Sequence, residues 1–87
     1  MRREDIRELT RAVPFKPFRV YISTGETFDI YHPDLIVATA GAAHIAYPSH
    51  DARPDNPDQA RIVSLYHIQK IEMLPTPTAP AGTNGDA

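Results

Sequence analysis

FRVYISTGETFDIYHP, residues 18–33, gives the clearest indication of the fold. Its apolar side chains alternate around a glycine turn, and this pattern ends at a proline. A two-residue turn at Thr24 and Gly25 would put apolar and polar side chains on the same face of the resulting hairpin. A three-residue loop removes this conflict if Ser23 and Thr24 form a type I turn and Gly25 adopts the left-handed conformation of a bulge. We therefore predict a hairpin closed by the three-residue loop.

This loop determines which side chains share each face of the hairpin. The outer face pairs Arg19 with Asp29, which we expect to form an exposed ion pair. Tyr21 lies opposite Thr27 on the same face, and Tyr31 follows near the end of the second strand. Exposed aromatic and charged side chains on one sheet face are typical of surfaces that bind a partner. The inner face is wholly apolar and consists of Phe18, Val20, Ile22, Phe28 and Ile30.

The chain is predicted to bend at His32 and Pro33, since proline cannot donate a hydrogen bond to a neighbouring strand. The apolar run DLIVAT, residues 34–39, then indicates a third strand. AGAA, residues 40–43, indicates a turn, and HIAYP, residues 44–48, a short strand that ends at its proline.

The second half of the chain alternates between polar and apolar segments. Residues 49–60 are polar, contain two prolines and are predicted to form a long exposed loop. RIVSLYHIQKIEML, residues 61–74, is predicted to be two strands separated by a tight turn near Tyr66 and His67. Residues 75–87 contain three prolines and no large apolar side chain, which predicts a disordered tail. The buried candidates of the apolar segment are Ile62, Val63, Leu65, Ile68, Ile71 and Met73 or Leu74.

A helix precedes these strands. Residues 3–13 place Ile6, Leu9 and Val13 at helical spacing, and Pro14 ends the pattern. The whole therefore predicts one α+β domain, mostly β, over residues 1–74, in which about five short antiparallel strands form a strongly bent sheet or a small barrel. The strand segments are placed at about 18–23, 26–32, 35–39, 44–47, 61–65 and 68–74.

This order of elements resembles the Sm-like family, whose small Sm/SH3-like barrel occurs in the bacterial Sm-like RNA chaperone. The resemblance rests on the pattern V-x-I-x-x-G-x-x-F, which begins at Val20, and on residues 61–74, which are similar to the strand, short turn and strand that end that fold. The segments PFKPFRV, from Pro14, and HPD, from His32, also resemble short bacterial proteins of unassigned function. That second resemblance implies no activity.

The Sm-like RNA pocket does not carry over to the matching positions. The glycine at which the second Sm strand bends falls at Ile30. The Asp and Asn of the base pocket fall at Leu35 and Ile36. The closing Tyr-Lys-His motif falls on Ser64, Leu65 and Tyr66, with His67 one place late. The resemblance thus implies the barrel rather than the pocket.

Composition sets further limits on function. Nine Lys and Arg against eleven Asp and Glu leave a net charge of −2, which disfavours a general binder of phosphate backbones, although residues 1–16 form a more basic region. The absence of cysteine excludes disulfides, thiolate metal ligands and a thiol nucleophile. No apolar run is long enough for a signal peptide or a membrane span, so we expect a cytoplasmic protein without a membrane partner.

The sequence contains no diagnostic catalytic motif. His32, His44, His50 and His67 lack metal-binding spacing, and no phosphate-binding loop or nucleophile motif accompanies them. We expect no enzyme, cofactor or metal, and interpret the chain as a binding module for protein or for a second copy of itself. The alternatives are an Sm-like RNA binder, which would use Arg19, Tyr21, Tyr31 and the basic helix, and a metal-dependent enzyme, which would use the histidines. The candidate binding residues are Arg19, Tyr21, Tyr31, His32, Tyr66 and His67.

Overall fold

The computed structural model describes residues 1–53 and 55–75, so the predicted disordered tail lies outside it apart from Pro75. One helix, α1 (Arg3–Arg11), precedes six strands and two short 3₁₀ helices. The strands are β1 (Phe18–Ile22), β2 (Thr27–Ile30), β3 (Ile36–Ala38), β4 (Ala42–Tyr47), β5 (Gln59–Ser64) and β6 (Ile68–Met73). The 3₁₀ helices are η1 (Pro33–Leu35) and η2 (Leu65–His67). The predicted α+β class, mostly β, is confirmed.

The β1–β2 hairpin has the predicted three-residue loop. The N–H of Ile22 donates to the carbonyl of Glu26 at 2.9 Å, and the N–H of Gly25 donates to the carbonyl of Ile22 at 2.9 Å. Gly25 has a φ of +97°, which L-amino acids rarely adopt. Val20 pairs with Phe28, so the predicted register is confirmed.

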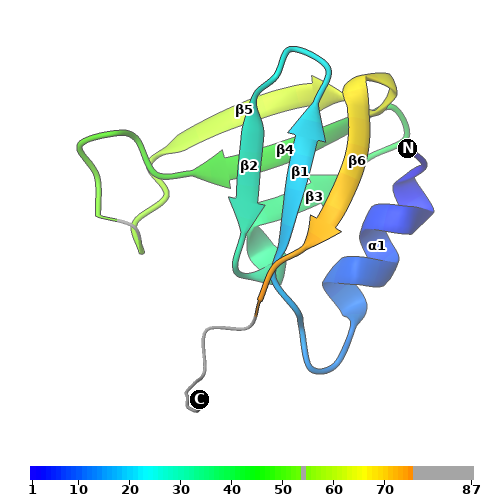
Figure 1. The fold of residues 1–87 in the computed structure, drawn as a ribbon, viewed down its shortest axis with the longest axis horizontal. Coiled ribbons are helices and arrows are strands. Elements are labelled where there is room, and N and C mark those ends of the chain that lie inside the picture. Colours follow the sequence, from blue (N-terminus) through cyan, green and yellow to red (C-terminus); the bar gives the residue numbers. More distant parts are fainter. Residues whose placement is uncertain (54, 76–87) are drawn as a thin grey trace.

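The six strands pair as two three-stranded antiparallel sheets, in the orders β2-β1-β6 and β3-β4-β5. In Figure 1 the first sheet lies in front of the second, their strands cross steeply, and α1 stands at the flank beside β6. Pro33 begins η1 where the chain passes from the first sheet to the second, which is the bend expected at His32 and Pro33. Within residues 1–53 and 55–75 no strand pairing links the two sheets into a closed barrel.

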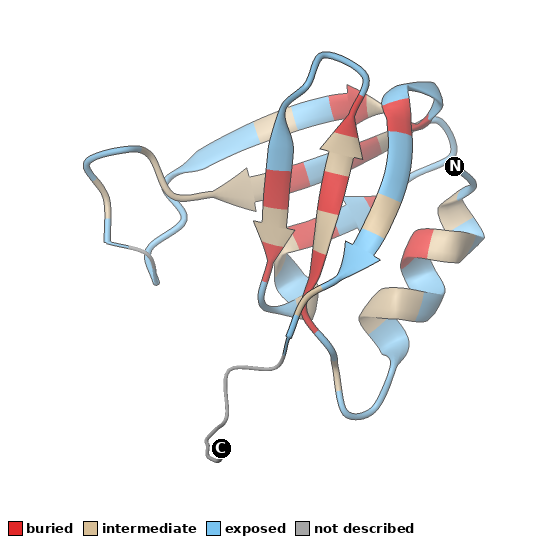
Figure 2. Ribbon diagram, viewed as in Figure 1, coloured by how far each residue is buried: buried red, intermediate tan, exposed pale blue. Residues whose placement is uncertain are grey.

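Buried apolar side chains fill the space between the sheets, as the red segments on facing strands in Figure 2 show. Phe18, Val20 and Ile30 of the hairpin are completely covered. Ile45 of the second sheet is 1% exposed, and Ile6 of α1 is buried to the same extent. At the start of the helix, the Asp5 carboxylate accepts the N–H of Arg2 at 3.1 Å. The helix packs on the core through Ile6, and Leu9 and Phe15 pack against the same core.

Several element boundaries differ from the sequence-based expectations, among them the end of β2, which lies at Ile30 instead of residue 32. The helix α1 ends at Arg11, before Val13, and leaves that side chain exposed. The strand β4 already begins at Ala42, because this alanine pairs with Ser64 instead of forming part of a turn. The strand β5 begins at Gln59 and so shortens the predicted loop. Ladder pairing overrides the weak strand preference of alanine and glutamine at these positions.

One residue predicted to be buried, Ile62, is exposed, and of the alternatives Met73 and Leu74 it is Leu74 that is half-buried. Ile62 points to the outer face of the second sheet, where its cross-strand partner is His44, and Met73 lies at the end of the edge strand β6. Side chains alternate between the faces of a strand, so the apolar neighbours Ile62 and Val63 cannot both face the core. The residues that are buried as predicted are Val63, Leu65 and Ile68.

Candidate functional site

The outer face of the first sheet brings together Arg19, Tyr21 and Tyr31, as the hairpin register predicted. The Nε of Arg19 donates to Oδ1 of Asp29 at 2.6 Å, and its Nη2 donates to Oδ2 at 3.1 Å. The hydroxyl of Tyr31 donates to the same carboxylate at 3.4 Å. Hydrogen bonding from Arg19 holds the pKa of Asp29 below its ordinary value. The predicted ion pair is confirmed, and the charges of Arg19 and Asp29 neutralise each other.

Tyr21 is held on the same face by two residues of β6. Its hydroxyl donates to Oε1 of Glu72 at 2.6 Å. The Nζ of Lys70 lies 4.5 Å from the centroid of its ring, a distance typical of a cation–π contact. Tyr31, 52% exposed, is therefore the aromatic side chain of this face that remains most open to a partner.

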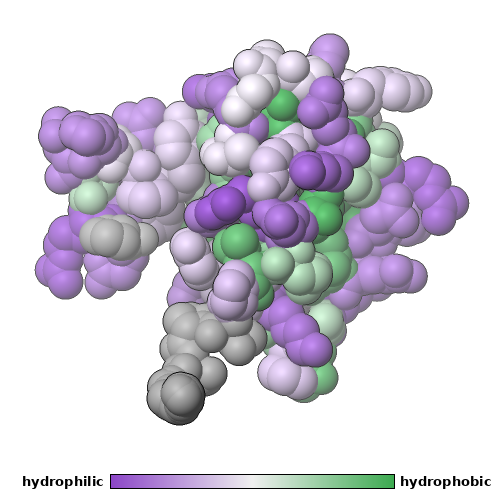
Figure 3. Space-filling view, in the orientation of Figure 1, coloured by the Kyte–Doolittle hydropathy of each residue, from purple (hydrophilic) through white to green (hydrophobic). Residues whose placement is uncertain are grey.

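A cleft of about 600 Å³, which we call the β2 cleft, runs along the open edge of β2. Figure 3 shows this part of the surface hollowed between the lobe at the left, formed by the loop between β4 and β5, and the body of the molecule. The predicted binding residues Tyr31 and His32 both line it. One wall comes from β2 and the segment after it, and the other from the end of β4 and the loop that follows. The lining residues are Thr27, Phe28, Asp29, Tyr31, His32 and Leu35 on the first wall and Tyr47, Pro48, Asp55 and Pro57 on the second.

Arg61 connects β5 to the turn of the hairpin. Its Nη1 donates to both carboxylate oxygens of Glu26, at 2.9 and 2.8 Å, and its guanidinium lies 5.7 Å from the centroid of the Phe28 ring. Hydrogen bonding from Arg61 lowers the pKa of Glu26. Sequence reasoning missed this pair, because no local pattern connects two residues that are 35 positions apart.

Tyr66 and His67 lie on η2, apart from the other predicted binding residues. Tyr66 is 93% exposed, and the Oγ of Ser64 accepts its N–H at 3.2 Å. The Nδ1 of His67 lies 3.2 Å from the Oγ of Ser23 in the hairpin turn. The six predicted residues therefore form no single site, since Arg19 and Tyr21 lie on the sheet face, Tyr31 and His32 line the β2 cleft, and Tyr66 borders another pocket.

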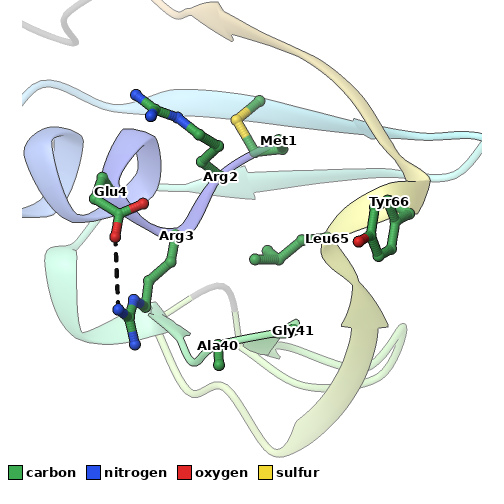
Figure 4. A pocket seen from close by; sticks show the side chains of 8 residues that line it. All are labelled: Met1, Arg2, Arg3, Glu4, Ala40, Gly41, Leu65 and Tyr66. Carbon is green, nitrogen blue, oxygen red and sulfur yellow. Dashed lines mark ion pairs between the residues drawn. The ribbon is translucent and has the colours of Figure 1, made fainter.

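Tyr66 borders a second pocket, of about 430 Å³, which we call the α1–η2 pocket. Figure 4 shows Arg2 and Arg3, from the start of α1, on one side of it and Tyr66 on the other. Arg3 forms an ion pair with Glu4 at 3.5 Å. The pKa of the Glu4 carboxyl is lowered, mainly by a hydrogen bond from its own main-chain N–H and to a smaller extent by the charge of Arg3. The Nε of Arg3 is buried and has no hydrogen-bond partner among the described residues. The pocket thus combines two arginines, the Glu4 carboxylate and one exposed aromatic ring.

The open edge of β5 is the third exposed feature. The N–H of Leu65 donates to the carbonyl of Gly41 at 3.0 Å, and bonded positions recur at every second residue of an antiparallel ladder. The main-chain groups of Ala60 and Ile62 therefore point away from β4. Ile62 is 67% exposed, although β-branched side chains are usually covered in sheets.

The four histidines occupy separate parts of the fold. Over residues 1–53 and 55–75, no three His, Cys, Asp or Glu side chains gather closely enough to hold a metal ion. In the same ranges, none of the helices is both long enough and apolar enough to cross a membrane.

Comparison of the chain with models of protein families, with curated proteins and with solved structures finds no match. Its function is therefore inferred from the geometry of these surfaces.

Proposed function

We propose that the chain is a non-catalytic binding module that recognises protein, in the first instance a second copy of itself, along the open edge of β5. The observation that carries this proposal is the exposure of Ile62, 67%, in the middle of a strand edge that pairs with no other strand within residues 1–53 and 55–75. Such an edge offers main-chain donors and acceptors to an added strand, and an apolar side chain on it gains stability when a partner covers it.

The outer face of the second sheet supports the same proposal. Monomeric proteins commonly protect sheet edges with charged side chains, lysine above all. This face carries no Asp, Glu, Lys or Arg, and the arginine of β5, Arg61, is paired with Glu26. The side chains that share the face are Val37, Ala42, His44, Ala46, Ala60, Ile62 and Ser64.

Light scattering over a range of protein concentrations tests the proposal. The wild-type chain should have a mass above the 9.7 kDa of one copy, and the mass should rise with concentration. Ile62→Lys places a charge on the β5 edge and should lower the mass at each concentration. Val13→Lys is the matched control, since Val13 is 96% exposed and belongs to no strand. A wild-type monomer at every concentration, or an Ile62→Lys variant with unchanged mass, would contradict self-association through this edge.

Single-stranded RNA is the second candidate ligand, and the α1–η2 pocket is the observation that favours it. Tyr66 is exposed in a way that suits stacking on a base, and Arg2 and Arg3 border the same pocket. The element order, in which the short η2 turn precedes the last strand, also supports the resemblance to Sm-like RNA-binding proteins.

Fluorescence anisotropy of a labelled, short single-stranded RNA of mixed sequence tests this second function. If arginines contact phosphates, affinity should fall steeply between about 50 and 200 mM salt. Tyr66→Ala should weaken binding by about 1–3 kcal/mol, the contribution of one stacked base. Tyr31→Ala is the control, because Tyr31 lies outside the α1–η2 pocket. An absence of binding at low salt, or equal losses in the two variants, would exclude RNA recognition at this pocket.

A further inference from the structure

The β2 cleft exposes a row of unpaired main-chain groups. Ile22 donates its N–H to Glu26, and bonded positions recur at every second residue of an antiparallel ladder, so Phe28 is the next residue of β2 that bonds to β1. The N–H and C=O groups of Thr27 and Asp29 therefore point away from β1. Among the described residues no strand pairs with this side of β2, and both residues line the cleft.

The wall that faces this row is mostly apolar. It contains Tyr47, Pro48 and Pro57, together with one acidic residue, Asp55. The ring of Tyr47 also contacts the ring of Phe28 edge to face, with 5.3 Å between the centroids, which holds the wall against the strand. The cleft therefore suits an extended segment that has hydrogen-bonding groups along one edge and apolar groups along the other.

The chain contains a segment with this alternation, PTPT at residues 75–78. In an extended strand the main-chain groups of successive residues point to opposite edges. Thr76 and Thr78 would thus present their N–H and C=O groups along one edge. Pro75 and Pro77 would present ring methylenes along the other, where no donor is needed and proline is tolerated.

We propose that residues 75–78 of a second copy of this chain bind in the β2 cleft as an added strand. Thr76 and Thr78 hydrogen-bond to the free main-chain groups of Thr27 and Asp29. The proline rings lie against the apolar wall. Because proline has no main-chain N–H, the outer edge of the added strand cannot pair with a further strand.

Distance favours the segment of a second copy over the chain's own. The N–H of Leu74 donates to the carbonyl of Pro17 at 3.0 Å, which places the end of β6 beside β1. The distance from β6 to a strand added at the open side of β2 is three strand spacings of ~4.8 Å, or about 14 Å. An extended chain advances about 3.3–3.6 Å per residue, so a chain's own residues 75–78 would be consumed in reaching its own cleft.

This inference rests on the proposed self-association but uses a different edge, β2 in place of β5. The two can therefore fail independently, because Ile62 lies outside the β2 cleft.

Amide hydrogen exchange of the full chain, followed by NMR at several protein concentrations, tests the inference. The amides of Thr27 and Asp29 should exchange roughly tenfold more slowly than in the double variant Thr76→Pro/Thr78→Pro, which removes both donors of the segment. The protection should increase with protein concentration. The amide of Phe28 bonds within the hairpin and is the internal control. Pro75→Ala/Pro77→Ala is the matched variant, because it keeps both threonine donors and should retain most of the protection.

Each outcome decides one point. Equal exchange of Thr27 and Asp29 in the wild type and the threonine-to-proline variant would overturn the assignment of the cleft. Protection that is independent of concentration would show that the chain's own segment binds and would overturn the role of a second copy. If the exchange is unchanged while Ile62→Lys still lowers the mass in solution, the β5 proposal stands and the cleft proposal fails.

Discussion

Replacing Gly25 with alanine should destabilise the fold through the backbone alone. Gly25 has a φ of +97°, and a left-handed conformation costs an L-amino acid about 1–2 kcal/mol. A Cβ added at this position meets no atom within 4 Å, so no steric clash contributes. For a domain of this size each 1 kcal/mol lowers Tm by about 4–8 °C, so Gly25→Ala should lower it by roughly 4–16 °C.

Gly41→Ala is the matched control. A Cβ at Gly41 also meets no atom within 4 Å, but this glycine lies outside the left-handed region. Alanine should therefore leave Tm unchanged or raise it slightly, since it reduces the entropy of the unfolded chain by about 0.4–1 kcal/mol. Thermal unfolding followed by circular dichroism under identical conditions measures both variants. Equal Tm values for Gly25→Ala and the wild type, or equal losses in the two variants, would refute the role given to the conformation of Gly25.

Three further predictions concern the core, one ion pair and one turn. Phe18→Ala should cost about 3–5 kcal/mol because its side chain is 0% exposed, whereas Val13→Ala should leave the urea midpoint unchanged. Hydrogen bonding from Arg19 lowers the pKa of Asp29 in the folded state below its ordinary value of 3.8. The ion pair therefore stabilises the fold above that pH, and this stabilisation is lost as the pH falls. Asp29→Asn should remove it. The difference between the urea midpoints of wild type and variant should therefore be constant above about pH 4 and shrink as the pH falls below 3.8, and a difference that stays undiminished well below that pH would contradict the prediction. Ser64→Ala should cost about 1 kcal/mol in the same assay, because its hydroxyl caps η2, and an unchanged midpoint would show that the cap contributes nothing.

Features that depend on neighbouring residues could be predicted from the amino-acid sequence alone. The alternation on both sides of Gly25 allows one register without mixing polar and apolar side chains on a face, so the pair of Arg19 and Asp29 followed from it. The interruption at Pro33 followed from the missing proline N–H. These are local constraints of backbone geometry, and tertiary packing could not override them.

Which of these residues lie together, and which strand edges stay open, depends on the tertiary structure. The sequence pattern of β5 did not show whether Ile62 or Val63 faces the core, because that depends on the sheet against which the strand packs. It also did not show that Tyr66 lies beside Arg2 and Arg3, or that the loop between β4 and β5 forms the apolar wall of the β2 cleft. Contacts between distant segments follow from how the two sheets cross, and that arrangement minimises the exposed apolar surface of the whole chain rather than of any single segment.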